Sequence, residues 1–119
     1  AQVLLVCTDA ALAGAVAREV AEQVASLPRR ELAEAALANG TALIVDDLAE
    51  TAEIANLYAP EHLCLAVDDA EALVPAIRNA GAVFAGHAAA ETLGDYLAGS
   101  SHVLPTDGAA RAWGGVSVY

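Results

Sequence analysis

Lysine is absent from this 119-residue chain, so its positive charge comes from five arginines alone. Sixteen acidic residues outnumber them, and the net charge at pH 7 is -11. Proteins that bind nucleic-acid backbones or anionic membrane surfaces use clustered Lys and Arg, which this sequence does not have. We therefore expect no nucleic acid and no membrane among its partners. A G-x-x-x-x-G-K-[ST] phosphate loop is excluded for the same reason.

Long hydrophobic runs are also missing, although hydrophobic residues make up 57% of the chain. Acidic residues or arginine interrupt the apolar strings well before the roughly 20 residues that a membrane span requires. The composition is typical of a globular protein. The length predicts a single domain, residues 1–119, that buries a sizeable core, and the alternation of strands and helices described below predicts that this domain is α/β.

Only two cysteines are present, Cys7 and Cys64, and both lie in apolar segments that predict strands. Buried, reduced thiols of an intracellular protein fit this setting better than a disulfide or a metal pair. Methionine is absent, the chain begins on the strand-like "AQVLLVCT", and it ends on the apolar alternation "GGVSVY". These features lead us to expect a soluble, cytoplasmic fragment of a longer polypeptide, without a signal peptide.

Hydrophobic periodicity predicts alternating strands and helices. Short apolar runs rich in β-branched residues are typical of buried strands, and the four-residue spacing of Leu12, Val16 and Val20 is typical of an amphipathic helix. This alternation predicts a three-layer, incomplete Rossmann-like fold, with a mainly parallel sheet of about four strands and helices on both faces. We predict strands at 2–7, 41–46, 63–67 and 82–85, and helices at 9–26, 31–38, 48–57 and 72–79.

The segment after the predicted fourth strand is the longest one without helical or strand periodicity. It carries His87 and then "ETLGDYLAGSSHVLPTDG". Loops this long are usually functional or disordered, and the Gly, Tyr, Leu and Val content argues against simple disorder. In open parallel sheets, ligands bind beyond the carboxyl ends of the strands. We therefore expect a binding site in this loop.

Glu61 and His62 stand side by side in "NLYAPEHLCLAV", between a predicted helix and a predicted strand. A carboxylate and an imidazole on a loop can act as general acid and base near neutral pH. Alternatively, Pro60 starts a turn, Glu61 is solvated and His62 binds a backbone carbonyl. Asp95 and His102 can contribute to a metal site, although zinc takes three or four ligands at defined spacing. Residue types and spacing leave these alternatives open.

Four segments, in this order, resemble the histidinol dehydrogenase family: "NLYAPEHL", "IRNAGAVFAG", "ETLGDYLAGSSHVLPT" and "GAARAWGGVSV". The resemblance starts at "QVLLVCTD" and runs across the chain, and the succession of A-P-E-H-L, G-D-Y-x-x-G and H-V-L-P-T is its most specific part. It implies a homodimeric enzyme that contains zinc. Such an enzyme oxidises a small molecule, L-histidinol, to L-histidine through an aldehyde in two NAD-dependent steps of histidine biosynthesis.

By this resemblance, His62 is the base that takes protons as each hydride leaves, and Glu61 helps to activate the water that converts the aldehyde to the acid. Asp95 of G-D-Y matches a zinc ligand, and that zinc anchors the substrate's imidazole and amine. All three residues are expected to contact substrate and to converge at one edge of the sheet. The family's other zinc ligands are a Gln and a His before Ala1 and a His after Tyr119, and its NAD contacts also lie outside this span. The chain alone is therefore expected to be inactive and to bind zinc weakly.

Two local departures from the family pattern concern the substrate. Ser101 stands where Asn is usual, and "RAWGG" replaces a Ser-rich stretch. A paralogous dehydrogenase of the same fold, acting on another amino alcohol or a hydroxy-sulfonate, therefore remains an alternative. A stand-alone α/β binding module, such as a receiver-like domain, is the alternative from another class, but receiver chemistry needs a lysine.

Overall fold

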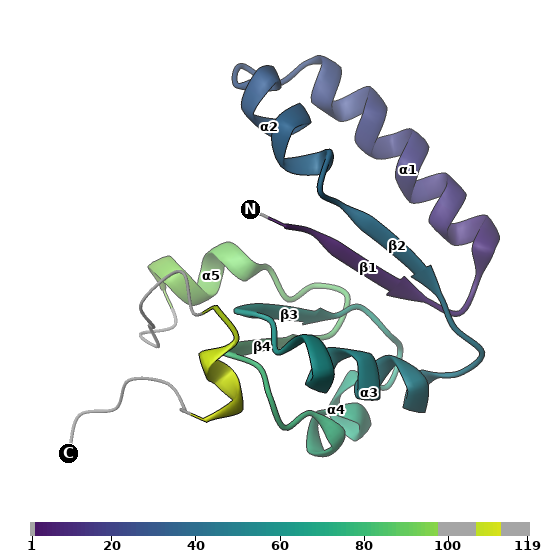
Figure 1. The fold of residues 1–119 in the computed structure, drawn as a ribbon, viewed down its shortest axis with the longest axis vertical. Helices are drawn as coiled ribbons and strands as arrows, with labels where there is room; N and C mark the ends of the chain where they lie inside the picture. The colour runs from purple at the N-terminus through teal and green to yellow at the C-terminus, as the bar shows by residue number, and fades with distance from the viewer. Residues whose placement is uncertain (1, 98–106, 113–119) are drawn as a thin grey trace. The chain divides into compact units, whose positions relative to one another are not determined.

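The computed structural model describes residues 2–97 and 107–112. The predicted strands and the first three predicted helices are confirmed, each to within a few residues at its ends. In chain order (Figure 1), the elements are β1 (Leu4–Cys7), α1 (Ala10–Ala25), α2 (Arg30–Leu37), β2 (Thr41–Ile44), α3 (Leu48–Tyr58), β3 (His62–Leu65), α4 (Ala70–Leu73), the 3-10 turn Val74–Ala76, β4 (Ala82–Ala85), α5 (Glu91–Tyr96) and the 3-10 turn Ala109–Arg111.

The chain divides into two compact units, residues 1–51 and 52–119. Each unit holds one pair of parallel strands, β1 with β2 and β3 with β4. The predicted α/β class and parallel pairing are confirmed. The four strands nevertheless form two two-stranded sheets in the described part of the chain, rather than one sheet of about four. That residues 1–119 form a single domain stays a prediction.

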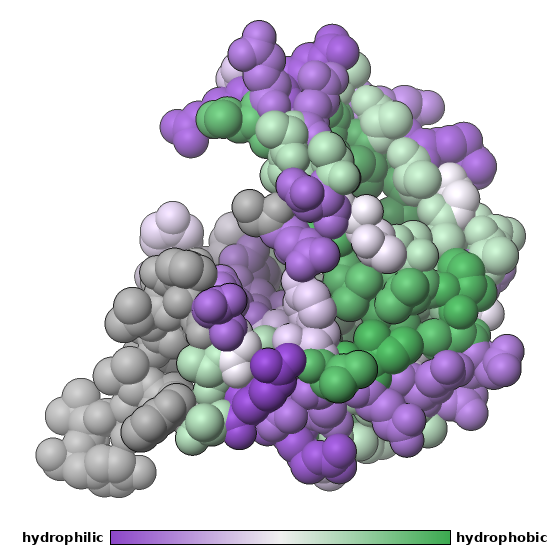
Figure 2. Space-filling model, viewed as in Figure 1, coloured by the Kyte–Doolittle hydropathy of each residue, from purple (hydrophilic) through white to green (hydrophobic). Residues whose placement is uncertain are grey.

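In the first unit, β1 and β2 pair with Leu4 opposite Thr41, and α1 contacts both strands. The side chain of Asn39 donates a hydrogen bond to the backbone carbonyl of Ala35 in α2. This bond caps the end of α2 before β2 begins. Hydrophilic side chains gather where α1 passes into α2 (Figure 2). The exposed residues of this connection include Arg29, Arg30 and Glu31.

Aspartates at two helix starts act as caps, because a helix leaves its first N–H groups without intrahelical partners. Asp9 accepts a hydrogen bond from the backbone N–H of Ala11 at 2.7 Å. At the start of α3, Asp47 accepts from the N–H of Glu50 at 2.9 Å, and Glu50 accepts in return from the N–H of Asp46 at 3.1 Å. This exchange is close to a capping box, in which the first residue and the residue three positions later each accept from backbone N–H groups at the helix start.

Two segments differ from the sequence-based expectation. The helix predicted at 72–79 is divided into α4 and the 3-10 turn Val74–Ala76, because Pro75 lacks the N–H that a continuing helix would use. Part of the long non-periodic segment is helical, since α5 covers Glu91–Tyr96. Among the described residues, no helix is both long and apolar enough to span a membrane.

The described core is built mainly from small side chains, and no large side chain is fully buried in it. Leu65 is buried at 5% exposure, whereas Cys64 beside it is exposed. Successive side chains of a strand point to opposite faces, so the alternation that buries Leu65 also turns Cys64 outward. The expectation of a buried thiol is confirmed for Cys7 and wrong for Cys64, and both cysteines are free. The buried apolar residues are Cys7, Val45, Ala52, Ala55, Ala59, Leu65 and Ala70.

Candidate functional site

The chain enters the site through a turn at the end of α3. The N–H of Ala59 donates to the carbonyl of Ala55 at 2.9 Å, and Ala59 has a φ of 56°, in the left-handed region. This conformation ends a helix but costs a non-glycine residue on the order of 1 kcal/mol. The residue keeps only 3% exposure, so its buried methyl group offsets part of that cost. Pro60 follows and directs the chain toward Glu61.

A close backbone approach at Gly81 then fixes the position of Glu61. The N–H of Gly81 donates to the carbonyl of Pro60 at 2.9 Å, and the N–H of Ala82 donates to the carbonyl of Glu61 at 2.8 Å. A Cβ atom on Gly81 would lie 2.6 Å from the Glu61 carbonyl oxygen. Only glycine therefore allows this contact, which extends the β3–β4 pairing back to the Glu-His pair.

His62 is the first residue of β3, and it contacts two side chains from later in the chain. Its Nδ1 lies 3.0 Å from Oε1 of Glu91, the first residue of α5. Its ring meets that of Phe84 edge to face, with 5.8 Å between centroids and 70° between planes. The His62 side chain retains 19% exposure and that of Glu91 retains 44%. The imidazole is thus held by a carboxylate and an aromatic ring.

Helix α5 carries both Glu91 and Asp95, one helical turn apart. Residues four apart in a helix lie on the same face, so the backbone position of Asp95 follows that of Glu91 beside β3. Gly94 allows this packing, because a Cβ atom there would lie 2.6 Å from Cε1 of Phe84. Glu61, His62 and the helix that bears Asp95 therefore occupy one end of the β3–β4 pair (Figure 1).

That end is the amino end of the strands, not the carboxyl end that the general rule for parallel sheets predicts. The residues beyond the carboxyl ends are Asp68, which follows β3, and His87, which follows β4. Oδ1 of Asp68 lies 3.1 Å from Nε2 of His87, and both side chains are largely exposed. The chain reverses through the residues after β4, and α5 thereby returns to the amino end. His102 lies outside the described residues.

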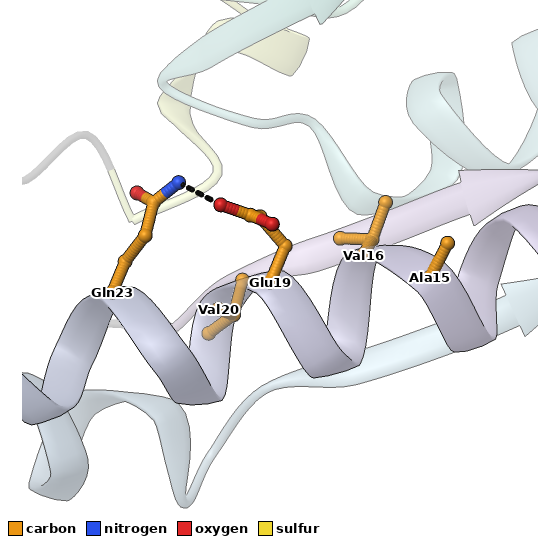
Figure 3. A pocket seen from close by; sticks show the side chains of 5 residues that line it. All are labelled: Ala15, Val16, Glu19, Val20 and Gln23. Atoms are coloured by element: carbon orange, nitrogen blue, oxygen red, sulfur yellow. Dashed lines mark hydrogen bonds between the residues drawn. The ribbon is translucent and has the colours of Figure 1, made fainter.

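Two other features of the described residues, acidic or metal-binding side-chain groups and a surface depression, give no second candidate site. Among the described residues, no group of three or more His, Cys, Asp or Glu side chains is placed to hold a metal ion. A depression of about 330 Å³ lies in the first unit, where its walls come from one face of α1 (Figure 3). It brings no reactive group together, since Glu19 and Gln23 bond to each other at 2.8 Å. Its lining residues are Ala15, Val16, Glu19, Val20 and Gln23.

Cys64 lies on the same face of β3 as His62, because the two residues are two positions apart in the strand. Although the residue as a whole is exposed, partial desolvation of its thiol raises the pKa of Cys64, and the nearby Glu91 carboxylate raises that pKa further. A raised thiol pKa keeps Cys64 protonated and poorly nucleophilic near neutral pH. Cys64 is therefore not a candidate nucleophile, but the pKa of its thiol depends on the charge of Glu91.

Sequence reasoning predicted Glu61, His62 and Asp95 as site residues, and it did not anticipate the contacts of Glu91, Phe84 and Gly94 at this end of the strand pair. Glu91 opens "ETLGDY", and the only signal available was its place four residues before Asp95. The contact between His62 and Glu91 joins positions 29 residues apart, and spacing along the chain does not reveal it.

Comparison with known proteins supplies the context for this geometry. The family model described as histidinol dehydrogenase matches residues 1–119, which is the whole chain. The chain belongs to the histidinol dehydrogenase family. The chain is 52% identical to the histidinol dehydrogenase from Aromatoleum aromaticum over 120 residues. It is 49% identical to the histidinol dehydrogenase from Gloeobacter violaceus over 119 residues.

A solved structure of the family supports the fold. The crystal structure of histidinol dehydrogenase from Elizabethkingia anophelis matches 98% of this chain with a TM-score of 0.93 and 40% sequence identity. The chain covers 27% of that structure's chain and 27% of each of the two relatives. The family resemblance expected from the motifs is therefore confirmed along the chain, which corresponds to about a quarter of the relatives' length.

Proposed function

We propose that this chain is the part of a histidinol dehydrogenase that supplies the acid–base pair and one zinc ligand. The complete enzyme would oxidise L-histidinol to L-histidine in histidine biosynthesis, as a cytoplasmic homodimer. The observation that carries the proposal is the clamp on His62, formed by Glu91 at 3.0 Å and by the Phe84 ring, in a chain of this family. An imidazole in fixed orientation beside a second carboxylate is suited to repeated proton transfer.

Glu91 determines which nitrogen of His62 takes part. When Nδ1 carries a proton it donates to Oε1 of Glu91, which favours the tautomer whose Nε2 can accept a proton. In the first oxidation, His62 takes the hydroxyl proton while a hydride leaves the carbinol carbon. In the second, Glu61 helps to remove a proton from the water that adds to the aldehyde carbon, and a second hydride leaves. NAD would accept both hydrides when bound.

Zinc is the second implied cofactor, and the described residues alone do not gather a complete ligand set for it. A structural or catalytic zinc takes three or four protein ligands. We propose that Asp95 contributes one of them and that residues outside this chain contribute the rest. The helix α5 would then join the two tasks, because it positions His62 through Glu91 and carries Asp95 one turn later.

The division of labour is tested in the full-length enzyme with two variants and two controls. His62→Ala should lower kcat about 10²–10⁴-fold and retain zinc, because a general base contributes about this much to rate. Asp95→Ala should lower the zinc content and raise KM for L-histidinol. His87→Ala and Asp68→Ala are the matched controls, since they remove the same side-chain types at the other end of the strands. A His62→Ala enzyme with full turnover would contradict the proposal.

The role of Glu91 has a smaller expected magnitude. A hydrogen bond to a charged group contributes about 1.5–3 kcal/mol, and 1.36 kcal/mol corresponds to tenfold in rate. Because the Glu91 side chain is 44% exposed, we expect Glu91→Ala to lower kcat about tenfold, near the low end of that range. Glu91→Gln retains an acceptor oxygen, so it should lower kcat less than Glu91→Ala does.

The substrate is tested separately in the full-length enzyme. Activity on a hydroxy-sulfonate but not on L-histidinol would instead support the paralogous dehydrogenase.

A further inference from the structure

Asn56 is a buried polar residue in the last turn of α3, with 7% exposure. Burying an amide is unfavourable unless its donors and acceptors are bonded. Its Nδ2 donates to the carbonyl of Ala76 at 2.9 Å, and its Oδ1 accepts from the N–H of Arg78 at 2.6 Å and of Asn79 at 3.1 Å. The amide group is therefore bonded at both ends to the segment that leads into β4.

The main chain of Asn56 is held by the same segment. Its carbonyl accepts a hydrogen bond from Nδ2 of Asn79 at 2.9 Å. The next carbonyl, that of Leu57, accepts from Nη2 of Arg111 at 2.6 Å. Carbonyls at the end of a helix have no intrahelical partners, so these bonds satisfy groups that α3 leaves open. They also fix where α3 ends.

The two segments that Asn56 joins are the ones that hold the Glu-His pair. Five residues after Asn56 the chain reaches Glu61, and two residues after Asn79 it reaches Gly81. Gly81 and Ala82 then bind the carbonyls of Pro60 and Glu61 at 2.9 and 2.8 Å. The amide of Asn56 and the Gly81 contact thus close the same loop from both sides.

From this arrangement we infer that Asn56 is a positioning residue for Glu61 and His62, which acts through the loop and not by contact with substrate. The inference rests on the proposed function, because it assumes that Glu61 and His62 carry the proton transfers. Loss of the amide would let the α3 end separate from residues 76–79, and the Glu-His pair would lose its fixed distance to substrate.

The test compares Asn56→Ala, Asn56→Asp and Leu65→Ala in the full-length enzyme. A displacement of about 1 Å at reacting groups costs up to about 10²-fold, so Asn56→Ala should lower kcat about 10–100-fold. Zinc content should be unchanged and KM for L-histidinol should change less than about threefold, because Asp95 lies on α5. Leu65→Ala is the control for a purely structural loss. It empties a buried position in β3 without touching the loop, so it should lower the thermal midpoint and leave kcat within about twofold.

Asn56→Asp tests the donor separately. Its carboxylate keeps an acceptor for the N–H groups of Arg78 and Asn79, but it turns an oxygen instead of the Nδ2 donor toward the carbonyl of Ala76 and buries a charge, so kcat should fall at least as far as in Asn56→Ala. If Asn56→Ala fails to fold, Asn79→Ala is the substitute variant. It removes the hydrogen bond that the Asn79 side chain donates to the Asn56 carbonyl, and it should lower kcat about 2–10-fold.

Three outcomes overturn the inference: kcat of Asn56→Ala within twofold of the wild type, kcat falling equally in Leu65→Ala, or kcat of Asn56→Asp equal to that of the wild type. If His62→Ala also retains full turnover, the proposed function itself fails. If His62→Ala loses turnover while Asn56→Ala keeps it, only the positioning role is wrong.

Discussion

Replacement of Gly81 by alanine tests the close approach that holds Glu61. The new Cβ atom would lie 2.6 Å from the Glu61 carbonyl oxygen and 3.3 Å from its carbon, and both are backbone atoms that a rotamer change cannot move. Overpacking of this kind costs about 1–3 kcal/mol. Weakening of the bond from the Ala82 N–H to the same oxygen costs about 1 kcal/mol more. The expected local loss is therefore about 2–4 kcal/mol.

Hydrogen exchange at the Ala82 amide measures this loss directly, because local opening governs the exchange of a bonded amide. At 1.36 kcal/mol per factor of ten, exchange should accelerate about 30- to 900-fold, and kcat should fall with it. Gly14→Ala is the matched control, since its Cβ atom would meet only Nη1 of Arg18 at 3.7 Å. That variant should gain up to about 1 kcal/mol from helix propensity. Unchanged exchange in Gly81→Ala, or equal stability of the two variants, would refute the reasoning.

Three further predictions concern other contacts. Gly94→Ala should lower thermal stability and kcat, because its Cβ atom would displace the Phe84 ring that contacts His62. Phe84→Leu in the same chain should restore part of both, and additive effects of the two changes would contradict the contact. The pH midpoint for alkylation of Cys64, measured by peptide mass mapping, should lie above that of an ordinary thiol. Glu91→Gln should lower this midpoint, because the Cys64 thiolate then has one negative charge fewer beside it. A midpoint that does not move in Glu91→Gln would exclude this coupling. Asp9→Ala should destabilise α1 by about 1 kcal/mol and Asp9→Asn should not, as measured by thermal unfolding, and equal loss in both would show that the cap is unimportant.

Much of the secondary structure could be predicted from the sequence because its signals are local. The apolar run around Val6 and the acidic cap at Asp47 each lie within a few residues of the element that they specify. Helix α5 could not be predicted in this way. Its six residues are too few to repeat an apolar stripe, and Gly94 within them lowers helix propensity. It forms because tertiary packing against Phe84 overrides that preference.

The candidate site shows the same division between local and tertiary signals. The motif that contains Glu61 and His62 is contiguous, so the pair could be selected from the sequence. The roles of Asn56 and Glu91 depend on partners at least 20 residues away, and both residues look like ordinary polar positions on helices. The place of this pair at the amino end of β3 also differs from the general rule, which puts ligands at carboxyl ends and does not anticipate that α5 returns to the amino end.

The contacts that define the Glu-His geometry begin at Asn56 and end with Gly94, so one uninterrupted stretch of the chain contains nearly all of them. Recombination between relatives could therefore exchange this stretch as a block with its geometry intact. A crossover between Asn56 and Asn79, in contrast, would join an amide from one parent to a backbone segment from another. Chimeras of family members should lose activity most often when their junctions fall inside this interval, even where the residues on both sides of the junction are identical.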